Sequence, residues 1–385
     1  MKKINSVILR EKITSRAEND LTQNNIAGAC VLVAQSGEIL FEECFGYSDA
    51  EKKTPLKKDS LFRLASMTKP ISAAAILAAE ERGYFSLDDP VGKYFPEFLN
   101  MKVGRLEQGR VMPDRRAKRE PILKDFLTHT SGFMCSSKLL SPQTESIPAS
   151  AYDSLEGMVN YCLKNTCLTF EPCQSVGYAP HIPFDLLALL IERKSGVKYA
   201  DFVNETVLSP LKLQNITYYP TDEAWGNLVK MCDRKSPEKM VNIELGRHTF
   251  EAFPLSYTSA GTGLIGNAFE YFVFAEMLRR GGEYEGIRIL SEDSVKKLCT
   301  VHVGEELIGK NSTSGWGLSV MVRRRGYPHL EEGSYGWSGA YGTHFFIDPK
   351  NEIVGIYLKN TRWYDSLGPG NTGRHFEADV SSSLE

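Results

Sequence analysis

The order of apolar and polar residues along the chain predicts an N-terminal helix followed by a β-hairpin. Residues up to about 26 have a helical pattern. Residues 28–49 alternate between apolar and polar positions and are rich in β-branched side chains, which is typical of strands. Ser36 and Gly37 interrupt this stretch, and a short pair of this kind is a common hairpin turn. We therefore expect the chain to begin with one helix and two antiparallel strands.

The pattern then becomes helical over a long central region. Residues 66–80 are rich in alanine and predict a helix that ends near Gly83. Its small side chains indicate close packing inside a core. Apolar residues recur at helical spacing in 121–133 and 183–208, whereas the polar stretch 134–153 predicts a loop.

Strand patterns return towards the C-terminus. Residues 266–282 predict a helix, and three predicted strands follow it at 316–325, 343–349 and 351–360. The turn-forming residues 348–351 separate the last two strands.

Strands at both ends of the chain and helices between them predict an α+β fold. We expect a mixed, largely antiparallel sheet with flanking helices, built from residues 1–84 and 240–385. A helical lobe, residues 85–239, would be inserted between these two parts, and the site would lie in the cleft between lobe and sheet.

Charge and hydropathy narrow the classes of partner. The formal net charge is −3, whereas proteins that bind nucleic acids usually present a basic face. The one basic stretch, residues 105–119, lacks interleaved aromatic residues and predicts a solvated loop. No segment has the roughly 18 apolar residues that cross a bilayer, and the apolar run after the N-terminal lysines stops at Leu9. We expect a cytoplasmic protein with neither a nucleic-acid nor a membrane partner.

The eight cysteines are expected to be reduced thiols that behave as small buried residues. The closest group, Cys162, Cys167 and Cys173, contains no Cys-x-x-Cys pair and has no histidine at zinc-finger spacing. We therefore predict no metal site.

Ser66 and Lys69 carry the first candidate chemistry. Residues three apart on a helix lie on the same face, one turn from each other. A serine hydroxyl becomes a nucleophile when a neighbour takes its proton, and a lysine can do so when burial depresses its pKa. Only this pair begins an apolar, alanine-rich helix, where a buried lysine needs a functional reason. The same spacing recurs, in loop or surface contexts, at Ser195/Lys198, Ser209/Lys212, Ser236/Lys239 and Ser294/Lys297.

The segment around this pair, FRLASMTK at 62–69, resembles the active-site segment of class C β-lactamases, D-alanyl-D-alanine peptidases and family VIII carboxylesterases. LTHTSG at 127–132 is similar to a second signature of the same superfamily. The resemblance is thus to the serine β-lactamase and penicillin-binding-protein superfamily, and most of all to family VIII carboxylesterases. Further similar segments follow in order within about residues 25–360, at 191–196, 210–213, 260–264 and 339–343.

The resemblance implies a role for Tyr178, which matches the tyrosine that exchanges protons with the Ser/Lys pair. Pro180 stands where the Tyr-x-Asn motif of the superfamily has its asparagine, and family VIII esterases often lack that asparagine too. The loss argues against recognition of a β-lactam or of a peptide amide side chain. His181 is a candidate substrate-binding residue in its place, although an exposed loop histidine is the simpler interpretation. His129, within the second signature, is expected to be structural.

The third element of the superfamily is Lys-Thr-Gly or a variant, and Trp337, Ser338 and Gly339 occupy that place. These three are the expected substrate-binding residues. The superfamily lysine attracts a substrate carboxylate, whereas Trp337 offers an aromatic wall and one indole donor. By position, the backbone N–H groups of Ser66 and Ala340 would form the oxyanion hole.

The resemblance implies a serine hydrolase that forms an acyl-enzyme at Ser66, with Lys69 and Tyr178 moving the proton and no metal or organic cofactor. A small-molecule ester or amide is the expected substrate, and a carboxylesterase on small or short-acyl esters is the favoured activity. The alternatives are a β-lactamase or D-alanyl-D-alanine peptidase, and a non-catalytic ligand-binding homologue. A Ser-His-Asp hydrolase fits less well, because residues 336–340 lack the last glycine of the nucleophile elbow and no helix pattern follows them. The oligomeric state is left open.

Overall fold

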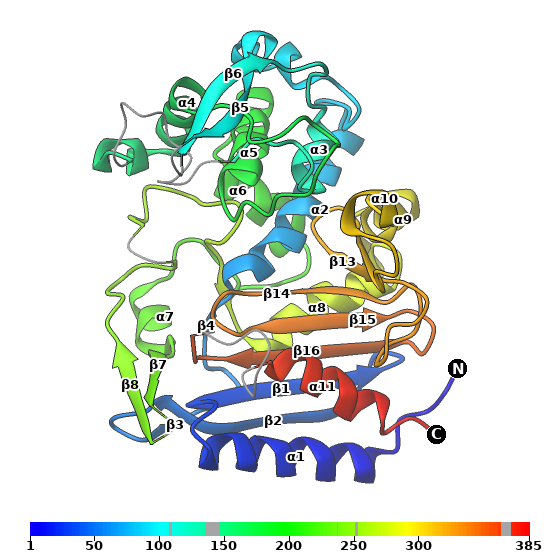
Figure 1. Ribbon diagram of the computed structural model, residues 1–385. Coiled ribbons are helices and arrows are strands. Elements are labelled where there is room, and N and C mark those ends of the chain that lie inside the picture. The colour runs from blue at the N-terminus through cyan, green and yellow to red at the C-terminus, as the bar shows by residue number, and fades with distance from the viewer. Residues whose placement is uncertain (108–109, 135–146, 237, 251–252, 363–370) are drawn as a thin grey trace.

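An eight-stranded antiparallel sheet occupies the lower half of the protein in the view of Figure 1. The computed structural model describes residues 1–385 except 108–109, 135–146, 237, 251–252 and 363–370. The strand order is β12-β13-β14-β15-β16-β1-β2-β3, so strands from the two ends of the chain meet in the middle. The strands are β1 (Gly28–Gln35), β2 (Glu38–Asp49), β3 (Thr54–Pro55), β12 (Ser314–Trp316), β13 (Met321–Arg323), β14 (Tyr335–Ser338), β15 (His344–Asp348) and β16 (Ile353–Lys359).

Helices lie on both faces of this sheet and fill the region above it in Figure 1. The sheet and its flanking helices confirm the expected α+β fold. The helices are α1 (Ser6–Thr22), α2 (Thr68–Glu81), α3 (Leu123–Leu127), α4 (Leu155–Asn165), α5 (Ile182–Ser195), α6 (Tyr199–Val203), α7 (Asp222–Asn227), α8 (Ala268–Arg279), α9 (Glu292–Cys299), α10 (Glu305–Ile308) and α11 (Thr372–Ser381).

Side-chain alternation along the strands separates two apolar layers. Successive residues of a strand point to opposite faces. Phe345 of β15 packs against Tyr271 of α8, with ring centroids 5.1 Å apart, whereas the next residue, Phe346, packs against Phe376 of α11 at 5.5 Å. All of β1 is buried, because helices cover both of its faces. This explains why β1 reads as a nearly continuous apolar run.

The two predicted turns form as expected. β1 and β2 pair across the turn at Ser36 and Gly37, and β15 and β16 pair across the turn after Asp348. The chain termini also meet, since the backbone of Ile4 forms a bridge with that of Leu384. The N-terminal helix is shorter than expected and ends at Thr22.

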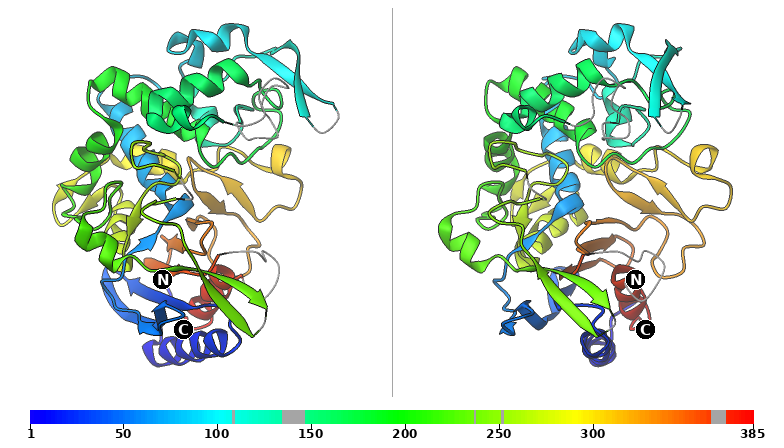
Figure 2. Two further views of the ribbon diagram at one scale, coloured as in Figure 1. Left: turned by 90° about the vertical axis from the view of Figure 1, so that its left-hand side faces the viewer. Right: turned by 60° about the vertical axis from the view of Figure 1, so that its left-hand side comes forward.

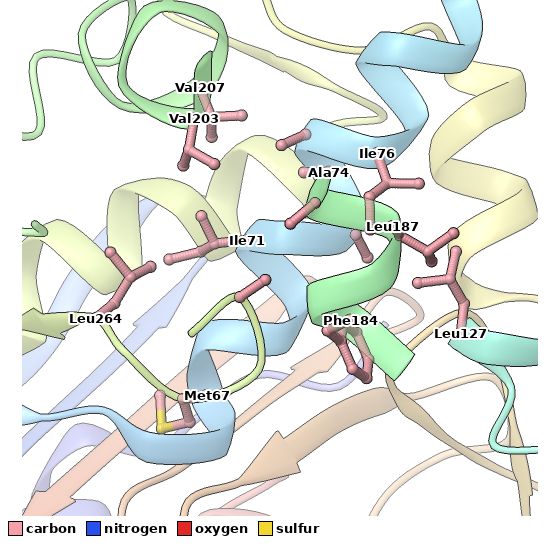
Figure 3. Close-up of a cluster of buried hydrophobic side chains, with 14 of the residues drawn as sticks. Met67, Ile71, Ala74, Ile76, Leu127, Phe184, Leu187, Val203, Val207 and Leu264 are labelled. Atoms are coloured by element: carbon pink, nitrogen blue, oxygen red, sulfur yellow. The ribbon is translucent and has the colours of Figure 1, made fainter. Parts of the chain in front are cut away.

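Helix α2 connects the sheet to the helical region and is buried along most of its length. Residues 68–79 are all buried, as expected for a helix that is apolar on every side. Figure 3 shows Ile71 and Ala74 of α2 among side chains of neighbouring helices, including Phe184 and Leu187 of α5. A lysine in such a helix must find polar partners, because burying an unpaired charge is costly.

The basic stretch 105–119 is mostly a β-hairpin, so the loop prediction was wrong. Strands β5 (Lys102–Glu107) and β6 (Arg110–Arg116) form it, and Figure 2 shows this hairpin at the outer end of the helical region, away from the sheet. Val103 and Val111 are buried on its inner side. Leu106 of β5 is exposed, so apolar and charged positions do not alternate as they do in a typical strand, and the stretch carries no clear strand pattern.

Two further predictions concern the helical region. The predicted loop 134–153 contains a 3₁₀ turn at Ala149–Asp153, and its residues 135–146 lie outside the described part of the chain. The division of the chain at 84/85 and 239/240 stays a prediction.

Shorter strand pairs complete the fold. The remaining strands are β4 (Phe62–Arg63), β7 (Met231–Ser236), β8 (Lys239–Ile243), β9 (Ile265–Gly266), β10 (Glu283–Tyr284) and β11 (Ile287–Arg288).

Two of the cysteines form a disulfide, which corrects the expectation that all are reduced. Cys30 of β1 and Cys44 of β2 are directly opposite each other in the register of the two strands, with their Cα atoms 4.0 Å apart, and are joined by an S–S bond. Antiparallel neighbours are close enough for such a bond. Among the described residues, the cysteines that are not part of a disulfide are Cys162, Cys167, Cys173, Cys232 and Cys299. Cys135 lies outside the described residues.

In the described part of the chain, every helix is too short or too polar to cross a bilayer. The cytoplasmic location stays a prediction.

Candidate active site

Ser66 lies in a tight turn immediately before α2. The turn is a 3₁₀ segment, Ala65–Met67, and Ala65 has a φ of 48°, in the left-handed region that side chains rarely adopt. Strain of this kind persists only where the surroundings impose it, and it often marks functional sites. Here the turn is tied down on both sides: Tyr271 donates a hydrogen bond to the carbonyl of Met67 (2.8 Å), and Thr343 donates one to the carbonyl of Leu64 (3.0 Å).

The ammonium group of Lys69 is buried at the first turn of α2, with no exposed surface on the residue. Its Nζ lies 3.2 Å from Ser66 Oγ and donates to the carbonyl oxygens of Pro180 (2.8 Å) and Gly261 (2.9 Å). Burial lowers the pKa of Lys69, and the neighbouring Tyr178 opposes this shift. Two N–H bonds of Lys69 Nζ point to these two carbonyl oxygens. The remaining direction at the nitrogen points to Ser66 Oγ, and it holds an N–H in the charged ammonium or a lone pair in the neutral amine.

Tyr178 approaches Ser66 from the other side, out of the loop before α5. Its hydroxyl donates to Ser66 Oγ at 2.6 Å. The phenol ring lies against Trp316, with centroids 6.2 Å apart, and against His129 at 4.8 Å. His129 is fully buried, and both burial and the charge of Lys69 hold its pKa well below the usual value. His129 therefore stays neutral and packs beneath Tyr178, in keeping with the structural role expected for it.

His181 is not the exposed loop residue that we favoured. Its ring is enclosed by Phe250 and Phe253, at centroid distances of 5.3 and 5.2 Å, and its Nδ1 lies 3.2 Å from Thr262 Oγ1. Burial, with a smaller effect of Lys69, lowers its pKa to about 3. The imidazole is therefore neutral at physiological pH.

The third motif forms one wall of a cavity of about 620 Å³. Strand β14 ends at Ser338, and the following Gly339 passes so close to the turn before α2 that a Cβ there would lie 2.4 Å from the carbonyl oxygen of Leu64. This contact needs a glycine and brings the third motif beside Ser66. Of the predicted residues, those that line the cavity are Ser66, Tyr178, Trp337, Ser338, Gly339 and Ala340.

The wall nearest Ser66 is aromatic. The indole rings of Trp316 and Trp337 have centroids 4.6 Å apart, and Trp337 lies 5.5 Å from the ring of Tyr178. The cavity lining also contains the polar residues Arg323, His344 and Arg374. The sequence analysis assigned none of these, because they are brought to the cavity by β13, β15 and the start of α11.

Sequence analysis also missed Asp185, which has no exposed surface in α5. Its carboxyl group accepts a hydrogen bond from the backbone N–H of Ala260 (2.8 Å) and one from the hydroxyl of Tyr257. It thereby holds the segment whose next carbonyl, that of Gly261, binds Lys69. Burial raises the pKa of Asp185 to about 7, against the opposing effect of these hydrogen bonds.

Replacing Asp185 by asparagine should remove a pH-dependent part of the stability. Between pH 4 and 7 the carboxyl group is protonated in the folded chain and ionised in the unfolded chain, whose pKa is about 4. The unfolded state then binds fewer protons, so this contribution to the free energy of unfolding falls as pH rises and is lost above about pH 7. The asparagine amide does not titrate.

The difference in free energy of unfolding, Asp185→Asn minus wild type, should therefore rise between pH 4 and 7, by up to about 1.4 kcal/mol per pH unit. Urea unfolding of both proteins at matched pH values measures this difference. The contributions of all other titrating groups to the free energy of unfolding are the same in both proteins and therefore cancel. A difference that is constant with pH would mean that Asp185 is already ionised in the folded protein.

The amino-acid sequence matches a known protein family over most of its length. A family model described as Beta-lactamase matches residues 13–378. The chain belongs to the Beta-lactamase family. This confirms the superfamily resemblance drawn from residues 62–69 and 127–132. Together with the esterases among its relatives, the family membership identifies the chain as a serine hydrolase enzyme.

The relatives of this Beta-lactamase family member include esterases. Esterase EstB of Burkholderia gladioli is 26% identical over 395 residues, which cover 95% of this chain and 94% of EstB. The solved structure of EstCE1, a hydrolase with promiscuous acyltransferase activity, matches with a TM-score of 0.77 at 22% identity and covers 98% of this chain and 99% of EstCE1. A family VIII carboxylesterase matches with a TM-score of 0.74 at 18% identity, covering 98% of each chain. The two structural matches show a shared fold.

Proposed function

We propose that this enzyme is a carboxylesterase on small or short-acyl esters and that it acts through an acyl-enzyme at Ser66. The observation that carries the proposal is the position of the Ser66 hydroxyl between Tyr178 Oη, at 2.6 Å, and Lys69 Nζ, at 3.2 Å. Both groups can exchange a proton with a serine hydroxyl at these distances. A non-catalytic binding protein would have no need to bury a lysine beside a serine.

In the proposed acylation step, Lys69 and Tyr178 share the removal of the proton from Ser66. The lowered pKa of Lys69 favours the neutral amine, whose lone pair faces Ser66 while its two N–H bonds stay on carbonyl oxygens. Ser66 Oγ then bonds to the ester carbonyl carbon, and the backbone N–H groups of Ser66 and Ala340 would stabilise the oxyanion. The proton passes to the leaving alcohol as the C–O bond breaks.

Deacylation reverses this path with water in place of the alcohol. Water attacks the acyl carbon and gives its proton to the Tyr178/Lys69 pair, and the proton returns to Ser66 as the acid leaves. Every proton in the cycle is carried by these side chains.

The aromatic wall supports esters over β-lactams as substrates. Trp337 stands where the superfamily lysine would attract a carboxylate, and Trp316 and Met321 extend the apolar surface near Ser66. The arginines of the β5–β6 hairpin, which could have supplied the missing charge, lie at the outer end of the helical region (Figure 1). A β-lactamase or D-alanyl-D-alanine peptidase remains the second candidate, because Arg374 lines the same cavity and carries a positive charge.

A fluorophosphonate probe and a substrate panel test the proposal. The probe should add to one residue, and peptide mapping should place it on Ser66. Hydrolysis of p-nitrophenyl butyrate should exceed that of nitrocefin and of a D-Ala-D-Ala peptide. Label on another serine would reject the assignment of Ser66, and nitrocefin opened as efficiently as the butyrate ester would favour the β-lactamase. A chain that takes no label and hydrolyses no member of the panel would be a binding protein.

A further inference from the structure

A chain of three hydrogen-bonded side chains runs from the cavity wall into the interior, separate from the Ser66 group. Ser338 Oγ lies 2.8 Å from His344 Nδ1, and His344 Nε2 lies 3.2 Å from Glu377 Oε1. Ser338 and His344 are opposite each other on β14 and β15, and Glu377 belongs to α11. We call these three residues the relay. Its outer end, Ser338, lines the same cavity as Ser66.

Glu377 is the fixed negative end of the relay. It has no exposed surface, Arg323 donates a hydrogen bond to it at 2.8 Å, and the hydroxyl of Tyr327 also donates to it. Burial alone would raise the pKa of Glu377, but the hydrogen bond from His344 and the charge of Arg323 outweigh burial and lower the pKa to about 2. The group is therefore a carboxylate, which only accepts hydrogen bonds.

This carboxylate determines which nitrogen of His344 carries the proton. Nε2 faces this carboxylate, which only accepts, so Nε2 carries a proton. A neutral imidazole has one N–H, and in that form Nδ1 would be left as an acceptor. Ser338 would then donate its own proton to Nδ1, across the 2.8 Å contact. The ring cannot easily rotate out of this arrangement, because the backbone of α11 packs directly on it: a Cβ added at Gly373 would lie 2.9 Å from His344 Cγ.

A serine hydroxyl has one proton to donate and two lone pairs that accept. With its proton donated to a neutral His344, Ser338 would offer only lone pairs to the cavity. We propose that His344 is held as the neutral Nε2–H tautomer and that the relay thereby makes Ser338 a hydrogen-bond acceptor for the acyl part of the substrate. The enzyme then favours esters whose acyl chain carries a hydroxyl or amide N–H over esters that carry a carboxylate. This inference rests on the proposed esterase function and extends it to the class of acyl group.

The charged groups around the relay fit this preference, with one exception. Arg323 is occupied by Glu377. Trp337, next to Ser338, carries no charge. Arg374 is exposed at the start of α11 and lines the same cavity, so it is the group that could attract a carboxylate despite the lone pairs of Ser338. The experiment therefore includes carboxylate substrates.

A matched series of p-nitrophenyl esters measures the preference. The acyl groups are hexanoyl, 6-hydroxyhexanoyl, the adipate half-ester and its methyl ester. In the wild type, the kcat/KM of the half-ester should lie on the order of tenfold below that of the methyl ester. The free carboxylate of the half-ester would face the lone pairs of Ser338 Oγ, which offer it no hydrogen-bond donor. Ser338→Ala should lower the ratio of kcat/KM for 6-hydroxyhexanoyl over hexanoyl by roughly 2- to 10-fold, the effect of one neutral hydrogen bond.

Two further variants separate the relay from a merely structural effect. Ser338→Thr keeps the hydroxyl and should keep the wild-type ratio for 6-hydroxyhexanoyl over hexanoyl. His344→Phe frees the proton of Ser338, so it should raise the half-ester relative to the methyl ester. A wild type that prefers the half-ester, or a Ser338→Ala variant with an unchanged ratio, would overturn the proposal. Ratios between substrates cancel any general loss of active protein.

Two measurements remain informative if the chain hydrolyses no ester. Calorimetric titration with 6-hydroxyhexanamide, hexanamide and adipamate should give the same order of affinity, and Ser338→Ala should remove the advantage of the hydroxyamide. Nitrogen NMR of the ¹⁵N-histidine-labelled protein, with His344→Phe for assignment, should show Nδ1 of His344 without a proton. A protonated Nδ1, or adipamate as the tightest ligand, would overturn the proposal whatever the esterase result.

Discussion

Lys69→Arg should lower kcat/KM for short p-nitrophenyl esters by at least about two orders of magnitude, the scale of a lost general base. Arginine keeps the positive charge but cannot give up its proton at accessible pH. In the wild type, Lys69 Nζ has two carbonyl partners and Ser66 as its third neighbour, and burial lowers its pKa. The guanidinium group would donate to the same partners, yet it could not accept the proton of Ser66.

Lys198→Arg is the matched control, because Ser195 and Lys198 have the same spacing in an exposed position. It should leave kcat/KM unchanged. Circular dichroism and urea unfolding establish that each variant is folded, and Lys69→Met provides a second variant of similar length without a basic group. Near-normal turnover by folded Lys69→Arg or Lys69→Met would show that another group takes the proton of Ser66.

The main sheet could be predicted because its strands carry their own pattern. The hairpin at residues 28–49 alternates around a recognisable turn, and the strands near the C-terminus are β-branched runs separated by turn residues. The β5–β6 hairpin was missed because its strands do not alternate: Val103 and Val111 are buried, whereas Leu106 is exposed and most of the other residues are charged. A strand can thus be predicted from its local pattern when apolar and polar residues alternate, and is missed when charged residues dominate the segment.

The disulfide depends on a one-residue detail of register. Counting back from the turn, Gln35 pairs with Glu38, and the same register would place Cys30 opposite Glu43. A bulge between Val33 and Ala34 shifts the register by one residue, and Cys30 then faces Cys44. A bulge inserts one unpaired residue and leaves no clear signature in a sequence of this kind.

The partners of Lys69 were beyond sequence analysis for a different reason. The ammonium group is held by backbone carbonyls of Pro180 and Gly261, and a carbonyl looks the same at every position of a sequence. Asp185 acts on the Gly261 segment from a helix that is distant in sequence. Sequence motifs identify side chains that carry chemistry, whereas the groups that position them are set by the fold.

Tyr178→Phe should reduce kcat for p-nitrophenyl butyrate by about 10²- to 10⁴-fold, because it removes the hydroxyl that donates to Ser66 Oγ at 2.6 Å. The phenylalanine ring keeps the contacts with Trp316 and His129, so the wall of the cavity is preserved. Any loss can then be assigned to proton transfer. KM should change much less than kcat, since the removed group acts in the reaction rather than in apolar binding.

The loss should affect both halves of the cycle, because the same hydroxyl would return the proton to the alcohol and take one from water. Stopped-flow measurement of p-nitrophenol release should therefore show slow acylation, without a fast burst followed by a slow steady state. Tyr219→Phe is the control, since Tyr219 is exposed and its hydroxyl contacts Thr258 at 2.8 Å, outside the cavity. A full burst at the wild-type rate in Tyr178→Phe would mean that Lys69 alone activates Ser66 and that Tyr178 serves only deacylation.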